Sequence, residues 1–193
     1  MTVQTRYPNW FLAYANVFFE RHLRRYSGQP DLQFLQIGAF TGDASAWLLG
    51  NIPGARLIDV DTWEGSDEEV HGTFDWEDVE AVYDLRTAKA QASGRLTKVK
   101  EPSGEFFRRL PGRECFDFIY IDGDHTAKGV LEDAVAAFGL LKPGGLLAFD
   151  DYLWQSGKTD ENNPGIAIDA VRSIYRAHLD LVDIGQQAWF RKR

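Results

Sequence analysis

Five short apolar segments alternate with helix-like stretches along most of the chain. They span Leu32–Ile37, Arg56–Val60, Leu96–Val99, Phe116–Ile121 and Leu146–Phe149. Such alternation predicts crossover connections and a parallel sheet that is covered by helices on both faces. The last segment, LDLVDIGQQAWFRKR, predicts instead two strands that turn near Gly185 as a terminal hairpin. We therefore expect an α/β fold of three layers, α/β/α, around a seven-stranded, mostly parallel sheet with an antiparallel last strand.

The length of the chain fits one domain with one good core. It has 193 residues, of which 44% are hydrophobic, and no linker, repeat or low-complexity tract interrupts it. We expect residues 1–193 to form a single domain, in which residues 1–30 are a helical N-terminal segment and residues 32–193 the core. Aromatic and aliphatic residues recur at helical spacing before a stop at Gly28: Trp10, Phe11, Tyr14, Phe18 and Leu23. This periodicity favours a packing helix over a substrate lid or a dimer face.

Charge and cysteine content narrow the classes of partner. A net charge of −8 and a pI near 5.0 argue against a nucleic-acid surface, because such affinity comes largely from clustered Lys and Arg. Small molecules or other proteins, including a second copy in a homodimer, are the expected partners. The single cysteine excludes an internal disulfide, and the sequence has neither a run of 18 apolar residues nor a signal-peptide pattern. We therefore expect a soluble cytoplasmic protein that binds no membrane.

A glycine-rich turn follows the first apolar segment, in QIGAFTGDASAWLL. Gly38 and Gly42 permit positive φ there and let a ligand approach the backbone, while the helix that follows favours an anionic group at its start. The second segment ends at Asp61, about 20 residues beyond the turn, as expected for an acid that accepts both hydroxyls of a ribose. Asp61 could instead cap a loop beside Thr62, but its pairing with the turn favours a ribose-bearing cofactor. A dehydrogenase would usually carry G-x-G-x-x-G at this turn, and the sequence lacks that motif.

Acidic residues follow two of the later apolar segments. Asp122 lies in FIYIDGDH, and the pair Asp150 and Asp151 lies in GGLLAFDDY. Because the carboxyl ends of parallel strands meet at one edge of a sheet, these carboxylates are expected to converge. Without a lysine or arginine beside them they suggest a bound cation, and hard oxygen ligands suit Mg²⁺, Mn²⁺ or Ca²⁺. Asp124, in the same motif as Asp122, is expected to be a solvated or capping carboxylate at the start of a helix near Thr126.

These motifs, in their order along the chain, resemble those of class I S-adenosylmethionine-dependent methyltransferases. The matching stretches are QIGAFTGDASAWLL, ARLIDVDTWEG, FDFIYIDGDHTAKGVLEDAVAAFGLLKPGGLLAFDDY and the terminal hairpin. The similarity covers residues 32–193 and implies a Rossmann-like fold. Within that superfamily the chain is most similar to a small bacterial group with the motif D-G-D/S-H, related to the metal-dependent O-methyltransferases of the catechol, caffeoyl-coenzyme A and macrocin types.

The resemblance implies a role for each matching position. The residues of the first turn, Gly38, Ala39, Phe40 and Gly42, would face the methionine part of S-adenosylmethionine. Asp61 would hold the ribose with Trp63 nearby, Ser103 would lie by the adenine, and Asp122 would border the cofactor. A divalent cation, expected to be Mg²⁺, would be bound by Asp122, Asp150 and Asp151. His125 would be the catalytic base; its competing interpretation is a cap of the helix near Thr126. Gln36 stands where the family usually has an acid, and Asp151 replaces the Asn of the catechol branch.

The expected reaction is the transfer of a methyl group to an oxygen of a small polyhydroxylated metabolite. The metal would position and acidify one or two substrate hydroxyls, and His125 would remove the proton. The segment from Tyr152 to Gly165, which contains Trp154 and Lys158, is the expected lid over a sugar, a catechol or a similar molecule. Two alternatives stay open: a metal-independent small-molecule methyltransferase, and a protein that binds an adenosyl cofactor or a nucleotide without catalysis.

Overall fold

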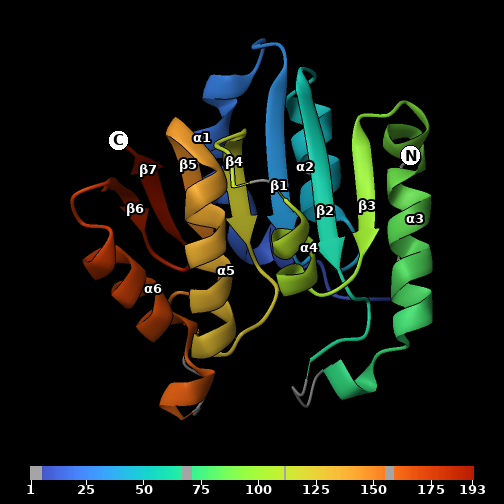
Figure 1. The fold of residues 1–193 in the computed structure, drawn as a ribbon. Helices are drawn as coiled ribbons and strands as arrows, with labels where there is room; N and C mark the ends of the chain where they lie inside the picture. Colours follow the sequence, from blue (N-terminus) through green and yellow to red (C-terminus); the bar gives the residue numbers. More distant parts are fainter. Residues whose placement is uncertain (1–5, 67–70, 111, 155–158) are drawn as a thin grey trace.

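The computed structural model describes residues 6–66, 71–110, 112–154 and 159–193. In this part of the chain seven strands form one sheet in the order β3-β2-β1-β4-β5-β7-β6 (Figure 1). The strands are β1 Leu32–Ile37, β2 Ala55–Asp61, β3 Leu96–Lys100, β4 Phe116–Ile121, β5 Leu141–Phe149, β6 Leu179–Ile184 and β7 Ala188–Lys192. β7 runs antiparallel to both β5 and β6, and the other pairs are parallel. The prediction of a seven-stranded, mostly parallel sheet with an antiparallel last strand is confirmed.

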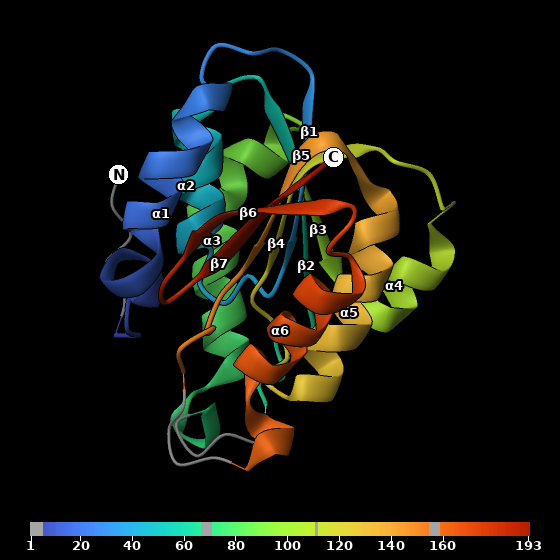
Figure 2. The ribbon, with the colours of Figure 1, turned by 90° about the vertical axis from the view of Figure 1, so that its left-hand side faces the viewer.

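Helices cover both faces of the sheet and give the predicted three layers. They are α1 Asn16–Leu23, α2 Asp43–Asn51, α3 Trp76–Ala92, α4 Ser103–Arg109, α5 Ala127–Leu140 and α6 Pro164–Ile174. α1, α2 and α3 lie on one side of the sheet and α4, α5 and α6 on the other, as the edge-on view in Figure 2 shows. Within the described ranges, none of these helices combines the length and the apolarity that a bilayer crossing requires.

Side-chain alternation along the central strands builds a core on each face. In β4, Phe118 and Tyr120 belong to the cluster beneath α1 and α2, whereas Ile119 and Ile121 belong to the cluster beneath α5 and α6. This is the period of two that a strand buried on both faces requires. It explains why β4 appears in the sequence as an apolar run that only Asp117 interrupts. The carboxylate that follows it is therefore held at a rigid strand end.

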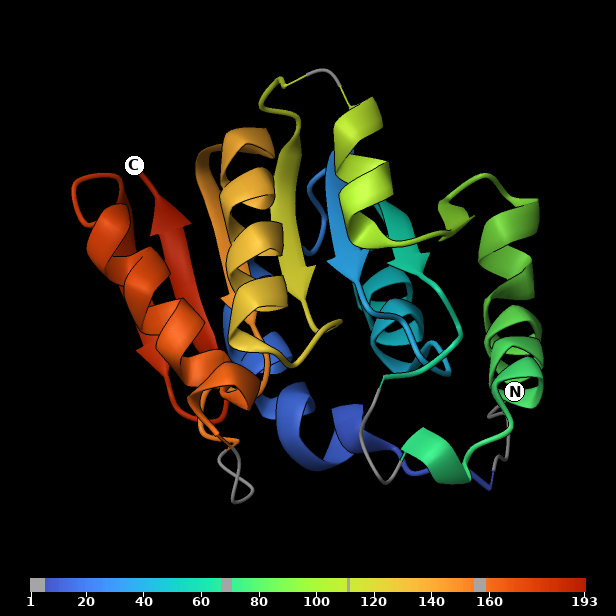
Figure 3. The ribbon, with the colours of Figure 1, turned by 60° about the horizontal axis from the view of Figure 1, so that its bottom comes forward.

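The N-terminal segment both packs on the sheet and reaches the cavity at the strand ends. It begins with a π-helical stretch, Phe11–Ala15, continues into α1 and ends in a 3₁₀ turn, Arg24–Tyr26. Phe19 of α1 is fully buried, and its ring meets those of Tyr120 and Trp189 edge-on at 5.0 and 5.7 Å. Residues before α1 cross below the carboxyl ends of the strands towards α3 (Figure 3), where the Tyr7 hydroxyl donates to the Asp78 carboxylate. The expected packing helix is present, and its N-terminal extension lines a cavity at the strand ends.

β5 begins earlier than the apolar pattern predicts. The sequence places its start at Leu146, but the strand begins at Leu141 and passes through Lys142-Pro143-Gly144-Gly145. A register shift opposite Phe116 and Phe118 and a positive φ of 79° at Gly144 accommodate this stretch. Leu141 pairs with Phe116 and Leu146 pairs with Phe118, so Lys142-Pro143-Gly144-Gly145 form a bulge between two buried pairs.

Candidate active site

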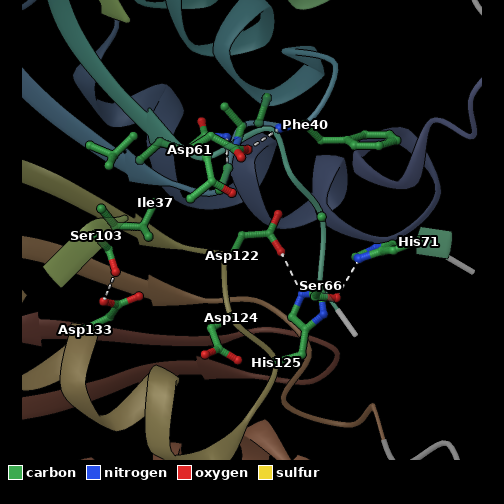
Figure 4. Close-up of a pocket in the computed structure, with 18 of the residues that line it drawn as sticks. Ile37, Phe40, Asp61, Ser66, His71, Ser103, Asp122, Asp124, His125 and Asp133 are labelled. Carbon is green, nitrogen blue, oxygen red and sulfur yellow. Dashed lines mark hydrogen bonds and ion pairs between the residues drawn. The ribbon is translucent and has the colours of Figure 1, made fainter. Parts of the chain in front are cut away.

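The main cavity of the described structure lies at the carboxyl ends of the parallel strands. Its volume is about 1030 Å³, and its walls come from the turn after β1, the end of β2, the start of α4, the loop between β4 and α5, and the N-terminal segment. Such an edge is where open α/β sheets bind ligands. Figure 4 shows Asp122 near the middle, with Ser103 and Asp133 on one side of it and His125 and His71 on the other.

The turn after β1 is built so that its backbone approaches β4 closely. Gly38 has φ of +83°, and a Cβ at this position would lie 1.8 Å from the Asp122 carbonyl oxygen. Only glycine satisfies both conditions. Gly42, with φ of +77°, precedes α2, and a Cβ there would lie 2.9 Å from the Tyr83 ring. The glycines predicted from sequence therefore bring the turn against its neighbours, and Gly38, Ala39 and Phe40 line the cavity.

Asp61 ties the end of β2 to that turn. Its Oδ2 accepts the N–H groups of Ala39 and Phe40 at 2.7 and 2.9 Å, and its Oδ1 accepts the N–H of Trp63 at 2.7 Å. A carboxylate offers about four acceptor directions. These three hydrogen bonds leave about one direction for a ligand on the cavity side. The two ribose hydroxyls expected at Asp61 would therefore have to share the one remaining acceptor direction of its carboxylate, or one of them would have to replace a backbone N–H that now donates to it.

Trp63 lies behind the turn rather than on the cavity wall. It is 2% exposed, its Nε1 donates to the Phe40 carbonyl at 2.9 Å, and its ring packs 4.7 Å from that of Tyr83. Among the described residues, neither Trp63 nor Gly42 lines the cavity. Both act through the shape of the turn, because their own surfaces are covered by α3.

Gln36 presents an unsatisfied acceptor beneath the same turn. The side chain is 2% exposed and lines the cavity, and its Nε2 donates to the Gly38 carbonyl at 2.7 Å. No donor of the described residues reaches its buried Oε1. A buried acceptor without a partner costs about 1–3 kcal/mol. Its position beside the turn suits a ligand that carries a hydrogen-bond donor.

The structure gathers two of the three predicted metal acids around His125. Ligand atoms of Asp122, His125 and Asp151 all lie within 4.8 Å of one another. The His125 Nε2 lies 3.1 Å from the Asp151 Oδ2 and 4.0 Å from the Asp122 Oδ1. Asp151 has φ of +57°, which turns the chain sharply at the end of β5. The sequence analysis predicted a group of Asp122, Asp150 and Asp151, whereas the group in the structure contains His125 and not Asp150.

Asp150 takes part in a different hydrogen-bond network. Its Oδ2 accepts the Tyr120 hydroxyl at 2.8 Å, and that hydroxyl accepts the Gln187 Nε2 at 3.1 Å. The Trp189 Nε1 in turn donates to the Gln187 Oε1 at 2.8 Å. Consecutive residues point in different directions, so Asp150 is oriented towards β7 while Asp151 faces His125.

Burial and mutual repulsion raise the pKa values of these acids. For Asp122, burial is the largest cause and the charge of Asp150 the next, while the hydrogen bond to His125 acts in the opposite direction. For Asp150, burial and the charge of Asp151 raise the pKa, and the Tyr120 hydroxyl lowers it. The neighbouring carboxylates thus repel one another when they are charged, and a bound cation would relieve this repulsion.

Aromatic side chains form the outer wall beside His125, and sequence reasoning assigned Phe40 and Trp154 to the site but not Trp10 or His71. Trp10 stacks on Phe40 at 4.9 Å, and Trp154 meets the His125 ring edge-on at 4.9 Å. His71 is 9% exposed, its Nδ1 lies 2.6 Å from the Ser66 Oγ, and its ring is 6.1 Å from that of His125. Trp10 was visible in the sequence only as one member of a packing stripe. Of the expected lid, Lys158 lies outside the described residues.

A second acidic position in the cavity was also missed. Asp133 of α5 is 4% exposed and lines the cavity, and its Oδ1 accepts the Ser103 hydroxyl at 2.6 Å. Burial raises the pKa of Asp133 to about 6. The available signal was its spacing, because Asp133 lies between Val130 and Ala137 on the core-facing stripe of the helix. Asp124, by contrast, accepts the Thr126 N–H at 2.7 Å, as a capping residue would.

Comparisons with known proteins agree on a methyltransferase fold. A sequence model described as a methyltransferase domain matches residues 35–152, which is more than half of the chain. No curated protein sequence matches the chain. The match covers the glycine turn, Asp61 and the acids after β4 and β5.

Solved structures of low sequence identity share the fold. The chain is similar to MycE methyltransferase from the mycinamycin biosynthetic pathway, in complex with Mg and SAH, with a TM-score of 0.62 and 19% identity over 97% of this chain and 51% of that chain. It is also similar to the O-methyltransferase TomG from Streptomyces achromogenes, in complex with SAM, with a TM-score of 0.60 and 19% identity over 91% of this chain and 78% of that chain. A structure described as a putative rRNA-methylase from Clostridium thermocellum gives a TM-score of 0.66 and 12% identity over the full length of both chains. The chain thus spans about half the length of MycE.

Proposed function

The chain belongs to the methyltransferase-domain family, and we propose that it is an S-adenosylmethionine-dependent O-methyltransferase that acts on a small polyhydroxylated metabolite with a divalent cation. The observation that carries this proposal is the grouping of Asp122, Asp151 and His125 within 4.8 Å beside the glycine turn. A cofactor surface and a cation surface therefore meet at Asp122, where a methyl donor and an activated hydroxyl would have to meet.

The turn after β1 fits the donor S-adenosylmethionine. Gly38, Ala39 and Phe40 give it a close backbone surface, and Asp61 retains about one acceptor direction for a ribose hydroxyl. The unpartnered Gln36 Oε1 would accept a hydrogen bond from the ammonium group of the methionine part. The neutral Gln36 amide fits here because Asp61 and Asp122, which line the same cavity, already supply negative charge.

The donor set at β4 and β5 fits a hard divalent cation. Asp122 and Asp151 offer carboxylate oxygens from two adjacent strand ends, and we retain Asp150 as a third candidate ligand behind them. Mg²⁺ suits such oxygen ligands better than zinc does. When bound, the cation supplies Lewis-acid stabilisation of the substrate oxygen and lowers its pKa.

The residues around the cation site would divide binding from proton transfer. Asp151 lies 3.1 Å from the His125 Nε2 and would orient the ring, and His125 would take the hydroxyl proton on its other ring nitrogen. The substrate oxygen then forms its bond to the methyl carbon while the sulfur–carbon bond breaks, which leaves S-adenosylhomocysteine. Trp10, Phe40 and Trp154 would hold the acceptor against the donor, so that orientation supplies much of the rate. Aromatic walls accept both the CH faces of sugars and flat catechol-like rings.

The net charge of −8 supports small-molecule partners over nucleic acid, and we keep a cytoplasmic location and a homodimer as further proposals.

The test of the proposed function is a methylation screen of hydroxylated metabolites with Mg²⁺, in which S-adenosylhomocysteine release is measured. Turnover that EDTA abolishes and Mg²⁺ restores supports the proposal. Full turnover in EDTA establishes a metal-independent methyltransferase. Binding of S-adenosylmethionine without turnover on any acceptor would support the non-catalytic alternative. Tighter binding of NAD⁺ than of S-adenosylmethionine would exclude both forms of methyltransferase.

A further inference from the structure

Asp133 is a carboxylate placed where a helix normally buries an apolar side chain. It shares the core-facing stripe of α5 with Val130, Ala134 and Ala137, all of which are buried. Unlike those neighbours, Asp133 also lines the main cavity. Figure 4 shows it beside Ser103 of α4, away from His125 and His71. The helix therefore presents a buried acceptor to the interior of the ligand site.

The protein itself satisfies this carboxylate only in part. Among the described residues, the one hydrogen bond to Asp133 comes from the Ser103 hydroxyl at 2.6 Å, and no lysine, arginine or histidine forms an ion pair with it. A carboxylate offers about four acceptor directions. Burying a charged group without partners is costly. The remaining acceptor capacity of Asp133 therefore suits a hydrogen-bond donor carried by a ligand.

The position of the pair indicates which part of the ligand that donor belongs to. In the proposed function, the ribose lies at Asp61 and the reactive methyl group lies towards Asp122 and His125. The two long substituents of a nucleoside ribose leave the ring in opposite directions, so the base extends away from His125. Ser103 and Asp133 lie on that side, and Val60 and Pro102 add apolar surface to the same cavity.

Adenine carries its only ring-edge donors on the exocyclic amino group. We propose that Asp133, held by Ser103, accepts this amino group and makes the site select an adenosyl ligand over its 6-oxo counterpart. This inference rests on the proposed function, because it takes the ligand to be an adenosyl thioether. A 6-oxo base would place a carbonyl oxygen against the carboxylate, so the two acceptors would repel each other.

The experiment compares two ligands on three proteins by isothermal titration. The ligands are S-adenosylhomocysteine and S-inosylhomocysteine, which differ at position 6 and in the protonation of N1. The proteins are the wild type, Asp133→Asn and the control Glu132→Gln. Glu132 is the neighbouring acid on α5, and its side chain is 66% exposed. The control therefore makes the same charge change outside the cavity.

The wild type should bind the adenosyl ligand about 10- to 100-fold more tightly than the inosyl ligand. Asp133→Asn keeps an acceptor for the Ser103 hydroxyl but adds an amide donor, so the preference should fall to within about threefold or reverse. Glu132→Gln should keep the wild-type preference.

Three results would overturn the inference. Equal binding of both ligands by the wild type does so without reference to any variant, even if Asp133→Asn fails to fold. An equal loss of affinity for both ligands in Asp133→Asn would show that Asp133 only joins α5 to α4. Wild-type protein that binds neither ligand would refute the proposed function and this inference with it, and this result differs from equal binding because no binding heat is then measured for either ligand.

Discussion

The protein without ligand should become more stable when Asp133 is replaced by asparagine. Burial raises the pKa of Asp133 from 3.8 to about 6, so the folded protein holds this group in a charged form that it disfavours. Each tenfold change in proton affinity corresponds to about 1.4 kcal/mol. Folding at pH 8 therefore carries a penalty of roughly 3 kcal/mol from this carboxylate. Asparagine carries no such charge.

The sign of the pH dependence follows from the direction of the shift. The folded state binds the proton more tightly than the unfolded state, so the penalty is complete above pH 6 and disappears as the pH falls towards 3.8. At pH 5 about half of it remains. The asparagine amide needs hydrogen-bond partners of its own, so the observed gain should be about 1–2 kcal/mol at pH 8 and smaller at pH 5.

Chemical unfolding of wild type and Asp133→Asn at both pH values measures this difference. Other buried acids, including Asp59 and Asp122, titrate in the same range, but they are present in both proteins and cancel in the comparison. Glu132→Gln serves as the control and should change stability by less than about 0.5 kcal/mol. A variant that is less stable than the wild type at pH 8, by the same amount as at pH 5, would refute the reasoning, because the Ser103 contact would then outweigh the cost of burial.

Three further outcomes test other parts of the structure. Gly38→Ala should abolish binding of S-adenosylhomocysteine and cost more than about 2 kcal/mol of stability, because its Cβ would meet the Asp122 carbonyl. Gly28→Ala, with φ of +84° and no atom within 4 Å of a Cβ, should show only the backbone cost of about 1 kcal/mol in the same unfolding and titration assays. Mg²⁺ should raise the melting temperature of the wild type, because binding at a hundredfold excess over Kd adds about 2.7 kcal/mol to the free energy of unfolding. The melting temperature of Asp151→Asn should not rise, and an equal rise in both proteins would exclude Asp151 as a ligand. Phe19→Ala should cost about 3–5 kcal/mol, whereas Val17→Ala, at a residue 55% exposed, should cost less than about 0.5 kcal/mol by denaturant midpoint.

Much of the fold was predictable because its signals are local. The apolar residues of β4 reflect its burial on both faces, and the glycines after β1 reflect the close approach of the backbone there. Both signals lie within a few residues of the feature that they predict. The start of β5 was mispredicted because a bulge at Lys142-Pro143-Gly144-Gly145 separates the buried residue Leu141, which pairs with Phe116, from the rest of the strand. An apolar pattern identifies a strand only where it is uninterrupted, so a paired residue before a bulge is missed.

The site was predictable where the fold itself brings residues together. Asp122 and Asp151 end adjacent strands, so their proximity follows from the order of the sheet. The Asp150 side chain points towards Tyr120 rather than His125. This direction depends on the backbone conformation at the end of the strand, which the sequence pattern does not predict. Trp10 and His71 reach the cavity from segments far apart in sequence, so only the tertiary arrangement reveals them.

Acids with raised pKa values lie on both sides of the cavity, and this arrangement links stability to ligand binding. Asp122 lies beside His125, and Asp133 lies beside Ser103, and burial is the largest cause of the raised pKa at each acid. A fold selected for stability alone would replace such groups with apolar residues, as Val130 and Ala137 on the same helix show. Each acid therefore lowers the stability of the protein without ligand, and in the proposed function it would gain an interaction when its ligand binds. A cation at one side and a hydrogen-bond donor at the other would relieve these two costs independently, because the two groups contact different atoms of the bound molecules. In the proposed function, each ligand would therefore meet one of these acids, while the turn at Asp61 and Gly38 is already held by internal hydrogen bonds.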